Sequence, residues 1–126
     1  MPPIKVVFFK DPDNVAPAKI WLDEIVVKRD RRIAAKLELR IEMLRNEGRN
    51  LRRPISDYLR DGIYELRAKL GAVNYRLLYF FEGSCAVISD GCTKEARIPT
   101  REIEIAIGNK QLFKTDPEKY TFKEKD

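Results

Sequence analysis

The chain has 126 residues, the length of one domain that buries roughly two-thirds of its unfolded surface. It contains no histidine and two cysteines, which excludes histidine-dependent acid–base catalysis and leaves too few ligands for a zinc site. Its 25 lysines and arginines exceed its 20 acidic residues, for a formal net charge of +5; with no membrane-length apolar run and no signal-peptide pattern, we expect a cytoplasmic protein.

The N-terminal half predicts one strand and two helices. Residues 4–9 are β-branched and aromatic, which favours a strand. A helix begins near Pro17, where the missing N–H of proline costs little. Asp30 is expected to cap a second helix that ends at Gly48, and the two helices should form an antiparallel hairpin. The apolar residues of the second helix recur every three or four positions: Ile33, Leu37, Ile41 and Leu44.

The C-terminal half predicts a three-stranded antiparallel meander and a last helix. Residues 49–61 have no hydrophobic period and contain Pro54, so we expect a basic loop there. The expected strands are 63–68, 73–81 and 85–89, joined by glycine-containing turns. The last helix is expected at 100–113. Residues 114–126 are polar and charged, and we expect them to form a loosely ordered tail.

The resulting order is strand, helix, helix, strand, strand, strand, helix. It predicts an α+β fold in which a small antiparallel sheet carries the helical hairpin on one face and leaves the other face partly open. The domain is expected to be 1–113, followed by the tail 114–126. The first strand can pair with the meander in either direction. Cys85 and Cys92 should lie on opposite faces of one strand, so we expect no disulfide between them.

Cations on the meander indicate a site for an anion. Because side chains alternate along strands, Leu66 and Leu77 should face the helices, which leaves Arg67 and Arg76 on the opposite face. A tight hairpin would make these two arginines neighbours. Glu65 could serve as their resting counter-ion, and a phosphate would replace it with bidentate bonds. The alternative is a surface ladder of ion pairs without function.

Further cations extend this basic surface. Lys94 leaves the last strand at the same edge of the sheet, and Arg97 follows it. Between Lys28 and Arg53 the chain has ten cations against four anions. Such a local excess favours a polyanionic partner, whereas the alternative is an ordinary solvated helix face.

Four segments of the meander and the last helix form a pattern: Tyr64-Glu65-Leu66-Arg67, the run 75–81 beginning Tyr75-Arg76, Gly91-Cys92-Thr93-Lys94, and Ile98-Pro99 before the helix. With this pattern, residues 7–113 resemble the RelE/ParE superfamily, most closely its HigB-like, phage-derived branch. The resemblance implies a RelE-like fold and the toxin of a type II toxin–antitoxin pair. It further implies an mRNA endoribonuclease (an mRNA interferase) that works on the ribosome without a cofactor or metal and inhibits translation.

The resemblance also implies residue roles. Arg67 and Arg76 match basic positions on the second and third strands of the family, and Lys94 matches a basic position after the fourth. Asp90 stands where this branch commonly has a histidine, which makes Asp90 a candidate base, and Glu95 replaces a second basic residue. The expected RNA-binding cations are Arg32, Lys36, Arg40, Arg49, Arg52, Arg53 and Arg97.

The implied partners are a small antitoxin of the helix-turn-helix DNA-binding kind, mRNA and the ribosome, with no membrane. Two alternatives remain open at the level of sequence. One is a ParE-like toxin that inhibits gyrase and cuts no RNA. The other is a decayed toxin that only binds its antitoxin, which the departures at Asp90 and Glu95 favour.

Overall fold

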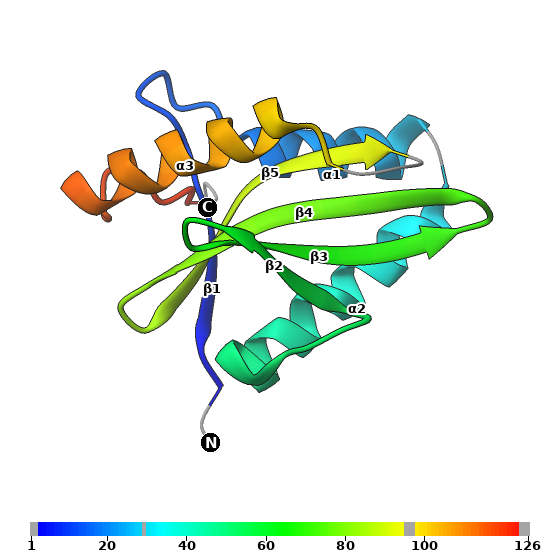
Figure 1. Ribbon diagram of the computed structural model, residues 1–126. Coiled ribbons are helices and arrows are strands. Elements are labelled where there is room, and N and C mark those ends of the chain that lie inside the picture. The colour runs from blue at the N-terminus through cyan, green and yellow to red at the C-terminus, as the bar shows by residue number, and fades with distance from the viewer. Residues whose placement is uncertain (1–2, 29, 95–97, 124–126) are drawn as a thin grey trace.

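The part of the chain that the structure describes folds around a five-stranded sheet, in the order β1-β5-β4-β3-β2 (Figure 1). The structure is a computed structural model, and it describes residues 3–28, 30–94 and 98–123. The strands are β1 (Lys5–Phe8), β2 (Ser56–Arg60), β3 (Ile63–Leu70), β4 (Val73–Glu82) and β5 (Cys85–Lys94). The helices are α1 (Pro17–Lys28), α2 (Arg31–Glu47), a short 3₁₀ helix (Gly48–Asn50) and α3 (Thr100–Thr115).

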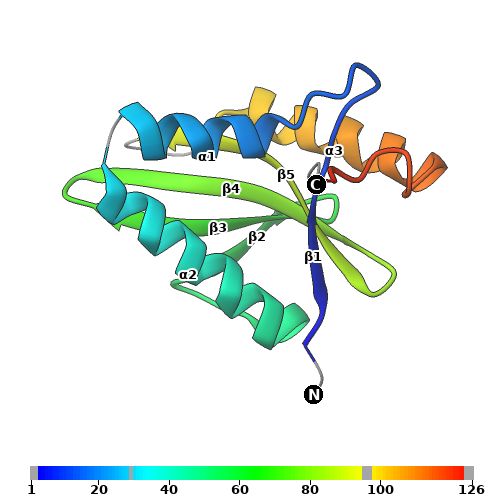
Figure 2. The ribbon, with the colours of Figure 1, turned by 180° about the vertical axis from the view of Figure 1, so that it is seen from behind.

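Helices cover both faces of this sheet. α1 and α2 lie on one face and α3 lies on the other (Figure 1 and Figure 2). Leu37 of α2 packs with Leu66 and Leu77 in one apolar cluster, and Phe113 of α3 packs edge-on against Phe80 in the second cluster. The predicted α+β fold, with the helical pair on one face, is therefore confirmed. No helix in residues 3–28, 30–94 and 98–123 is both long and apolar enough to cross a bilayer.

The limits of α2 follow from its two ends. The Asp30 side chain accepts the Arg32 N–H at 2.8 Å, which caps the first turn. Gly48 ends the helix with a φ of 56°, a left-handed conformation that glycine adopts at little cost. Ile33 and Leu37 are fully buried, as their spacing predicted. From their connection α1 and α2 diverge across the sheet, so the predicted hairpin is splayed (Figure 2).

The segment expected to be a loop throughout, 49–61, contains an edge strand. β2 pairs antiparallel with β3, with Ser56 opposite Leu66 and Tyr58 opposite Tyr64. The expectation of a loop was wrong because a short polar edge strand owes its structure to its neighbour rather than to a hydrophobic period of its own. At the other edge β1 pairs parallel with β5, which decides the direction that the sequence left open.

β5 is longer than expected and contains a bulge. It runs to Lys94 instead of ending at Ser89. Where Ser89 forms the extra residue, the register with β4 shifts by one. Cys85 packs in the cluster on the α3 side, and beyond the bulge Cys92 stands opposite Arg76, on that same side. The two cysteines therefore share a face, and the prediction of opposite faces was wrong because a one-residue shift inverts the alternation.

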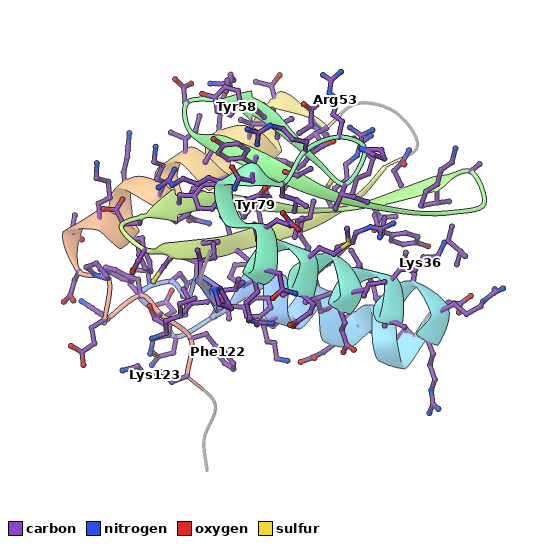
Figure 3. The ribbon with its side chains drawn as sticks, turned by 90° about the horizontal axis from the view of Figure 1, so that it is seen from below. Lys36, Arg53, Tyr58, Tyr79, Phe122 and Lys123 are labelled. Atoms are coloured by element: carbon purple, nitrogen blue, oxygen red, sulfur yellow. The ribbon has the colours of Figure 1, made fainter. Side chains whose placement is uncertain are left out.

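Residues 116–123, which follow α3, fold back onto β1, so this part of the expected tail is not loosely ordered. Tyr120 is buried and stacks on Phe9, with ring centroids 6.2 Å apart. The Phe122 N–H donates to the Phe8 carbonyl at 2.7 Å. Figure 3 shows Phe122 and Lys123 at the side of the molecule opposite Tyr58, a residue of β2. The last three residues lie outside the described part of the chain.

Candidate functional site

Two arginines face each other across the middle of the sheet. Arg67 of β3 is paired with Arg76 of β4 in antiparallel register. A tight turn sets this register, and its Gly71 has a φ of 62° that few other residues tolerate. Leu66 and Leu77, one position along each strand, point into the core under α1 and α2. The prediction that the two arginines are neighbours on the opposite face is confirmed.

The carboxylate of Glu65 lies between the two guanidinium groups. Its Oε1 accepts bonds from Nε of Arg67, at 2.9 Å, and from Nη2 of the same residue. Its Oε2 lies 3.8 Å from Nε of Arg76. The side chains of Glu65 and Arg76 are only 3% and 8% exposed, whereas that of Arg67 is 37% exposed. Glu65 is thus the counter-ion that was expected, and the ion pairs are buried rather than part of a surface ladder.

Arg76 keeps a hydrogen-bond donor that no described residue uses. Its Nε is buried and donates to no acceptor among the described residues, because the 3.8 Å separation from Glu65 is too long for a hydrogen bond. A buried donor without an acceptor costs free energy. An anionic oxygen beside this Nε would remove that cost with a charge-assisted bond. The site therefore favours an anion.

Both arginines line a groove of about 380 Å³ between β2 and the start of α3. We call it the cationic groove. Its lining residues are Asp57, Tyr58, Leu59, Arg60, Glu65, Arg67, Arg76, Ile98, Thr100 and Ile103. The strands supply the charged side chains, so the guanidinium groups are held on rigid elements. α3 supplies an apolar wall, which limits the access of water to one side of these groups.

Asp57 of the groove lining is paired with Arg53, which lies outside the lining. Arg53 Nε donates to Asp57 Oδ1 at 3.0 Å, and this hydrogen bond is the main cause that lowers the pKa of Asp57. Asp57 Oδ2 also lies 4.0 Å from Nη2 of Arg67. Together with Arg76 and Glu65, these residues place three guanidinium groups against two carboxylates, while Arg60, which also lines the groove, is paired with Asp61. The cluster therefore stays positive and can accept one more negative charge.

Asp90 does not line the cationic groove. It is buried on the α3 side, two residues before Cys92, and neither of its carboxylate oxygens has a hydrogen-bond partner among the described residues. Burial, together with the nearby carboxyl group of Glu102 on α3, raises its pKa to about 7 against the opposing effect of the Ser89 hydroxyl. Asn109 of α3 also binds Ser89, at 2.9 Å. Asp90 therefore belongs to a polar contact between β5 and α3.

Two candidate residues fall outside what the structure describes. β5 ends at Lys94, whose backbone is opposite Asn74 of β4, but the Lys94 side chain is not described. Arg97, with its two preceding residues, lies outside the described residues altogether. The structure thus brings together Arg67 and Arg76 of the expected catalytic set, and it leaves the role of Lys94 as a prediction.

The cations of α2 support the sheet. Lys36 Nζ donates to the Lys69 carbonyl at 3.0 Å, and Arg40 Nε donates to the Arg67 carbonyl at 3.1 Å. Both acceptors belong to β3 beyond the end of β2, so these side chains cap an otherwise open strand edge. Arg40 is half-buried as a result. Arg32 is exposed and forms a salt bridge with Asp30.

The cations after α2 gather on the opposite side of β2. The guanidinium group of Arg49 lies 4.3 Å from the ring centre of Phe81, and Arg52 donates to the carbonyl of Arg49 at 2.6 Å. Arg49, Arg52 and Arg53 line a second pocket there. Figure 3 shows Arg53 and Tyr58 at the edge of the molecule away from Phe122 and Lys123.

Reasoning from the sequence missed several residues of the site. Asp57 lies in the segment expected to be a loop, Thr100 and Ile103 come from a helix that was not expected to cover this face, and Glu102 meets Asp90 only through the docking of α3. The contacts with α3 are long-range and leave no trace in local spacing.

The family model of the phage-derived protein Gp49-like (DUF891) matches residues 23–111. This span covers most of the chain, from α1 into α3, and includes every described residue that lines the cationic groove. No curated protein matches the chain with significant similarity.

Proposed function

The chain belongs to the Gp49-like family of phage-derived proteins, a toxin-like family, and from that premise we propose that it is the toxin of a type II toxin–antitoxin pair. More specifically, we propose a HigB-like toxin that cleaves mRNA on the ribosome in the cytoplasm and so inhibits translation. The observation that carries the proposal is the buried Nε of Arg76, which has no acceptor among the described residues, beside Arg67 in the cationic groove.

The nucleophile of the proposed reaction is a ribose 2′-hydroxyl group of the RNA itself. A ribose 2′-oxygen attacks the adjacent phosphorus, and the bond from phosphorus to the 5′-oxygen breaks, which leaves a 2′,3′-cyclic phosphate and a 5′-hydroxyl. The 2′-hydroxyl gives up its proton, and the departing 5′-oxygen takes one. Negative charge on the phosphoryl oxygens increases at the transition state, so donors fixed beside those oxygens accelerate the step.

The residues of the groove have distinct proposed roles. Arg76 is rigid and buried, and would bind the phosphoryl oxygens with the donor that it does not use at rest. The guanidinium group of Arg67 is more exposed. It can release the Glu65 carboxylate and bind the phosphate instead, which provides a second charge-assisted donor. Glu65 orients both guanidinium groups. Lys94, at the end of β5, is the proposed proton-transfer group.

Asp90 receives a different role from the one that the family pattern implied. It is buried away from the groove lining, so we propose that it positions α3, whose Thr100 and Ile103 form the groove wall. We propose that the surrounding cations bind RNA through its phosphates, with an affinity that falls steeply as the salt concentration rises. These cations are Arg32, Lys36, Arg40, Arg49, Arg52, Arg53 and Arg97. The proposed partner is a small DNA-binding antitoxin.

Induction in cells tests the proposal. Wild type, Arg76→Ala and the control Arg31→Ala, an exposed cation at the start of α2, are each induced, and growth and transcript ends are measured by primer extension. We expect growth arrest with new transcript ends for wild type and control, and neither for Arg76→Ala. Arrest with DNA damage and intact transcripts would instead identify a gyrase inhibitor. No arrest in wild type would identify a protein that retains only antitoxin binding.

A further inference from the structure

β2 separates the cationic groove from a second pocket of about 500 Å³, which we call the basic-aromatic pocket. Leu59 packs in the apolar cluster on the α3 side, so the neighbouring residue Tyr58 turns to the side of α2, where Tyr64 faces it across the strands. The pocket is lined by these two tyrosines together with Arg49, Arg52 and Arg53. Its volume suits a nucleotide.

Tyr58 forms a fixed aromatic surface at the mouth of the pocket. The rings of Tyr58 and Tyr64 meet edge to face, with their centroids 5.0 Å apart. Tyr64 in turn stacks on Tyr79, which is buried in the core, with a centroid separation of 5.4 Å. The Tyr58 hydroxyl accepts the Gly62 N–H at 3.1 Å, which anchors the far end of the side chain. Although it is anchored at both ends, Tyr58 is 54% exposed. A large aromatic side chain that is both rigid and exposed is ready to stack against a flat partner.

Two of the three arginines that line the pocket carry positive charge that no described carboxylate neutralises. Among the described residues, neither Arg49 nor Arg52 forms a salt bridge with a carboxylate. Arg52 Nη1 instead donates to two backbone carbonyls, at 2.6 and 3.2 Å, and Arg49 lies over the ring of Phe81. Asp57 also lines the pocket but is paired with Arg53. Two positioned guanidinium groups therefore adjoin one exposed ring.

We propose that the basic-aromatic pocket binds a nucleotide of single-stranded RNA, with the base stacked on Tyr58 and the adjoining phosphate paired with Arg49 and Arg52. Aromatic side chains beside a cationic track are the combination that binds unpaired nucleic acid irrespective of its sequence. The inference rests on the proposed function, since it assigns a second contact for the same RNA, across β2 from the cleavage groove. An acidic protein segment would satisfy the arginines but has no need of an exposed ring.

Fluorescence anisotropy with the full chain tests this assignment. All proteins carry Arg76→Ala, which removes the proposed cleavage, and the probe is a labelled ten-nucleotide oligoadenylate. We expect Tyr58→Leu to weaken binding by about 10-fold or more, and Tyr58→Phe, which keeps the ring, to bind within about two-fold of the parent. An abasic decamer with the same phosphates should bind the parent and the Tyr58→Leu variant equally, because only stacking distinguishes them. Circular dichroism verifies that both variants are folded.

Three results would overturn the proposal. Equal binding of oligoadenylate by the parent and Tyr58→Leu would remove the stacking contact. An equal loss with the abasic decamer would show that the substitution acts on phosphate contacts instead. A glutamate decapeptide that binds as tightly, and depends on Tyr58 as strongly, would identify a protein-binding surface. Failure of the nuclease proposal is seen separately, as intact transcripts in cells that express wild type.

Discussion

The backbone of Gly91 in β5 lies directly under the indole ring of Trp21 in α1. A Cβ at Gly91 would stand 2.2 Å from Cδ2 and 2.3 Å from Cε3 of that ring, distances that atoms in a folded protein do not adopt. Trp21 also meets Tyr75 of β4, with ring centroids 6.5 Å apart. α1 therefore reaches the sheet at this point because position 91 has no side chain.

Gly91→Ala should consequently destabilise the protein by about 1–3 kcal/mol, since the added methyl group forces α1 away from β5. The free energy of unfolding in urea measures the effect. In a Trp21→Leu background the same substitution should cost much less, because the clash is gone. Gly108→Ala is the matched control: nothing lies within 4 Å of its added Cβ in α3, so it should stabilise the helix slightly. Equal costs of Gly91→Ala in both backgrounds would contradict the assigned clash.

Glu65→Gln should destabilise the protein by roughly 3–5 kcal/mol, because it leaves Arg76 buried without a negative partner. Urea denaturation of the variant measures the change. Adding Arg76→Met should recover much of the loss, since the uncompensated charge is then absent as well. Glu38→Gln, at an exposed position on α2, is the control and should be nearly neutral. A double variant no more stable than Glu65→Gln would be inconsistent with a charge-pair explanation.

Arg76→Lys should lower the rate of transcript cleavage by about 100-fold or more while the protein stays folded. Lysine retains the charge but cannot present the planar, multiple donors that two phosphoryl oxygens require. Primer extension over time after induction gives the rate, and Arg31→Lys is the control. A variant with near-normal cleavage would show that charge alone suffices, and the proposed bidentate contact would be wrong.

Stability should fall with rising pH because of Asp90. Below about pH 4 the Asp90 carboxyl group is protonated in both the folded and the unfolded chain. Burial raises its pKa in the folded protein to about 7. Between about pH 4 and pH 7 the unfolded chain therefore releases the proton while the folded chain retains it. The free energy of unfolding therefore declines across this interval and declines no further above it. Asp90→Asn removes the dependence and should be more stable than wild type at pH 8, on the order of 1–3 kcal/mol.

Urea titrations at pH 5 and pH 8 test this expectation, with the exposed residue Asp116 as control in the form Asp116→Asn. The gap between wild type and Asp90→Asn should widen from pH 5 to pH 8, whereas the control should follow wild type. A gap that stays constant would mean that Asp90 ionises at its ordinary pKa in the folded protein.

Tyr120→Ala should cost about 3 kcal/mol of stability, as expected when a buried aromatic ring is removed. The same measurement on Glu118→Ala, an exposed neighbour, should show little change. If both substitutions were neutral, the contact between Tyr120 and Phe9 would contribute nothing to the folded state.

The central part of the site could be predicted from the sequence because its geometry is local. Arg67 and Arg76 are joined by one tight hairpin, and a turn of known length determines which residues of its strands are opposite each other. Alternation of apolar residues then decides the face. The helix caps at Asp30 and Gly48 were equally visible, since capping depends on residues within one turn.

The parts that could not be predicted depend on contacts distant in sequence. β2 is polar and lies at an edge, so only its pairing with β3 makes it a strand. The bulge at Ser89 is a one-residue shift with no marker in composition, yet it moves Asp90 and Cys92 to the α3 side. Tyr120 is one aromatic residue in a charged segment, and its burial depends on Phe9, more than a hundred residues earlier.

The pairing of β1 has a consequence for how this chain is made. Its neighbour in the sheet, β5, is synthesised some 80 residues later, and the Phe122 N–H, which closes the outer side of β1, comes later still. In a nascent chain β1 therefore has no neighbouring strand until β5 has been synthesised. Pairing of the two strands must then close a loop of some 80 residues, and such long-range pairing is slow. The sheet around β1 is therefore complete only once residues 85–122 have been synthesised, and until then an early-binding protein would meet an incomplete sheet.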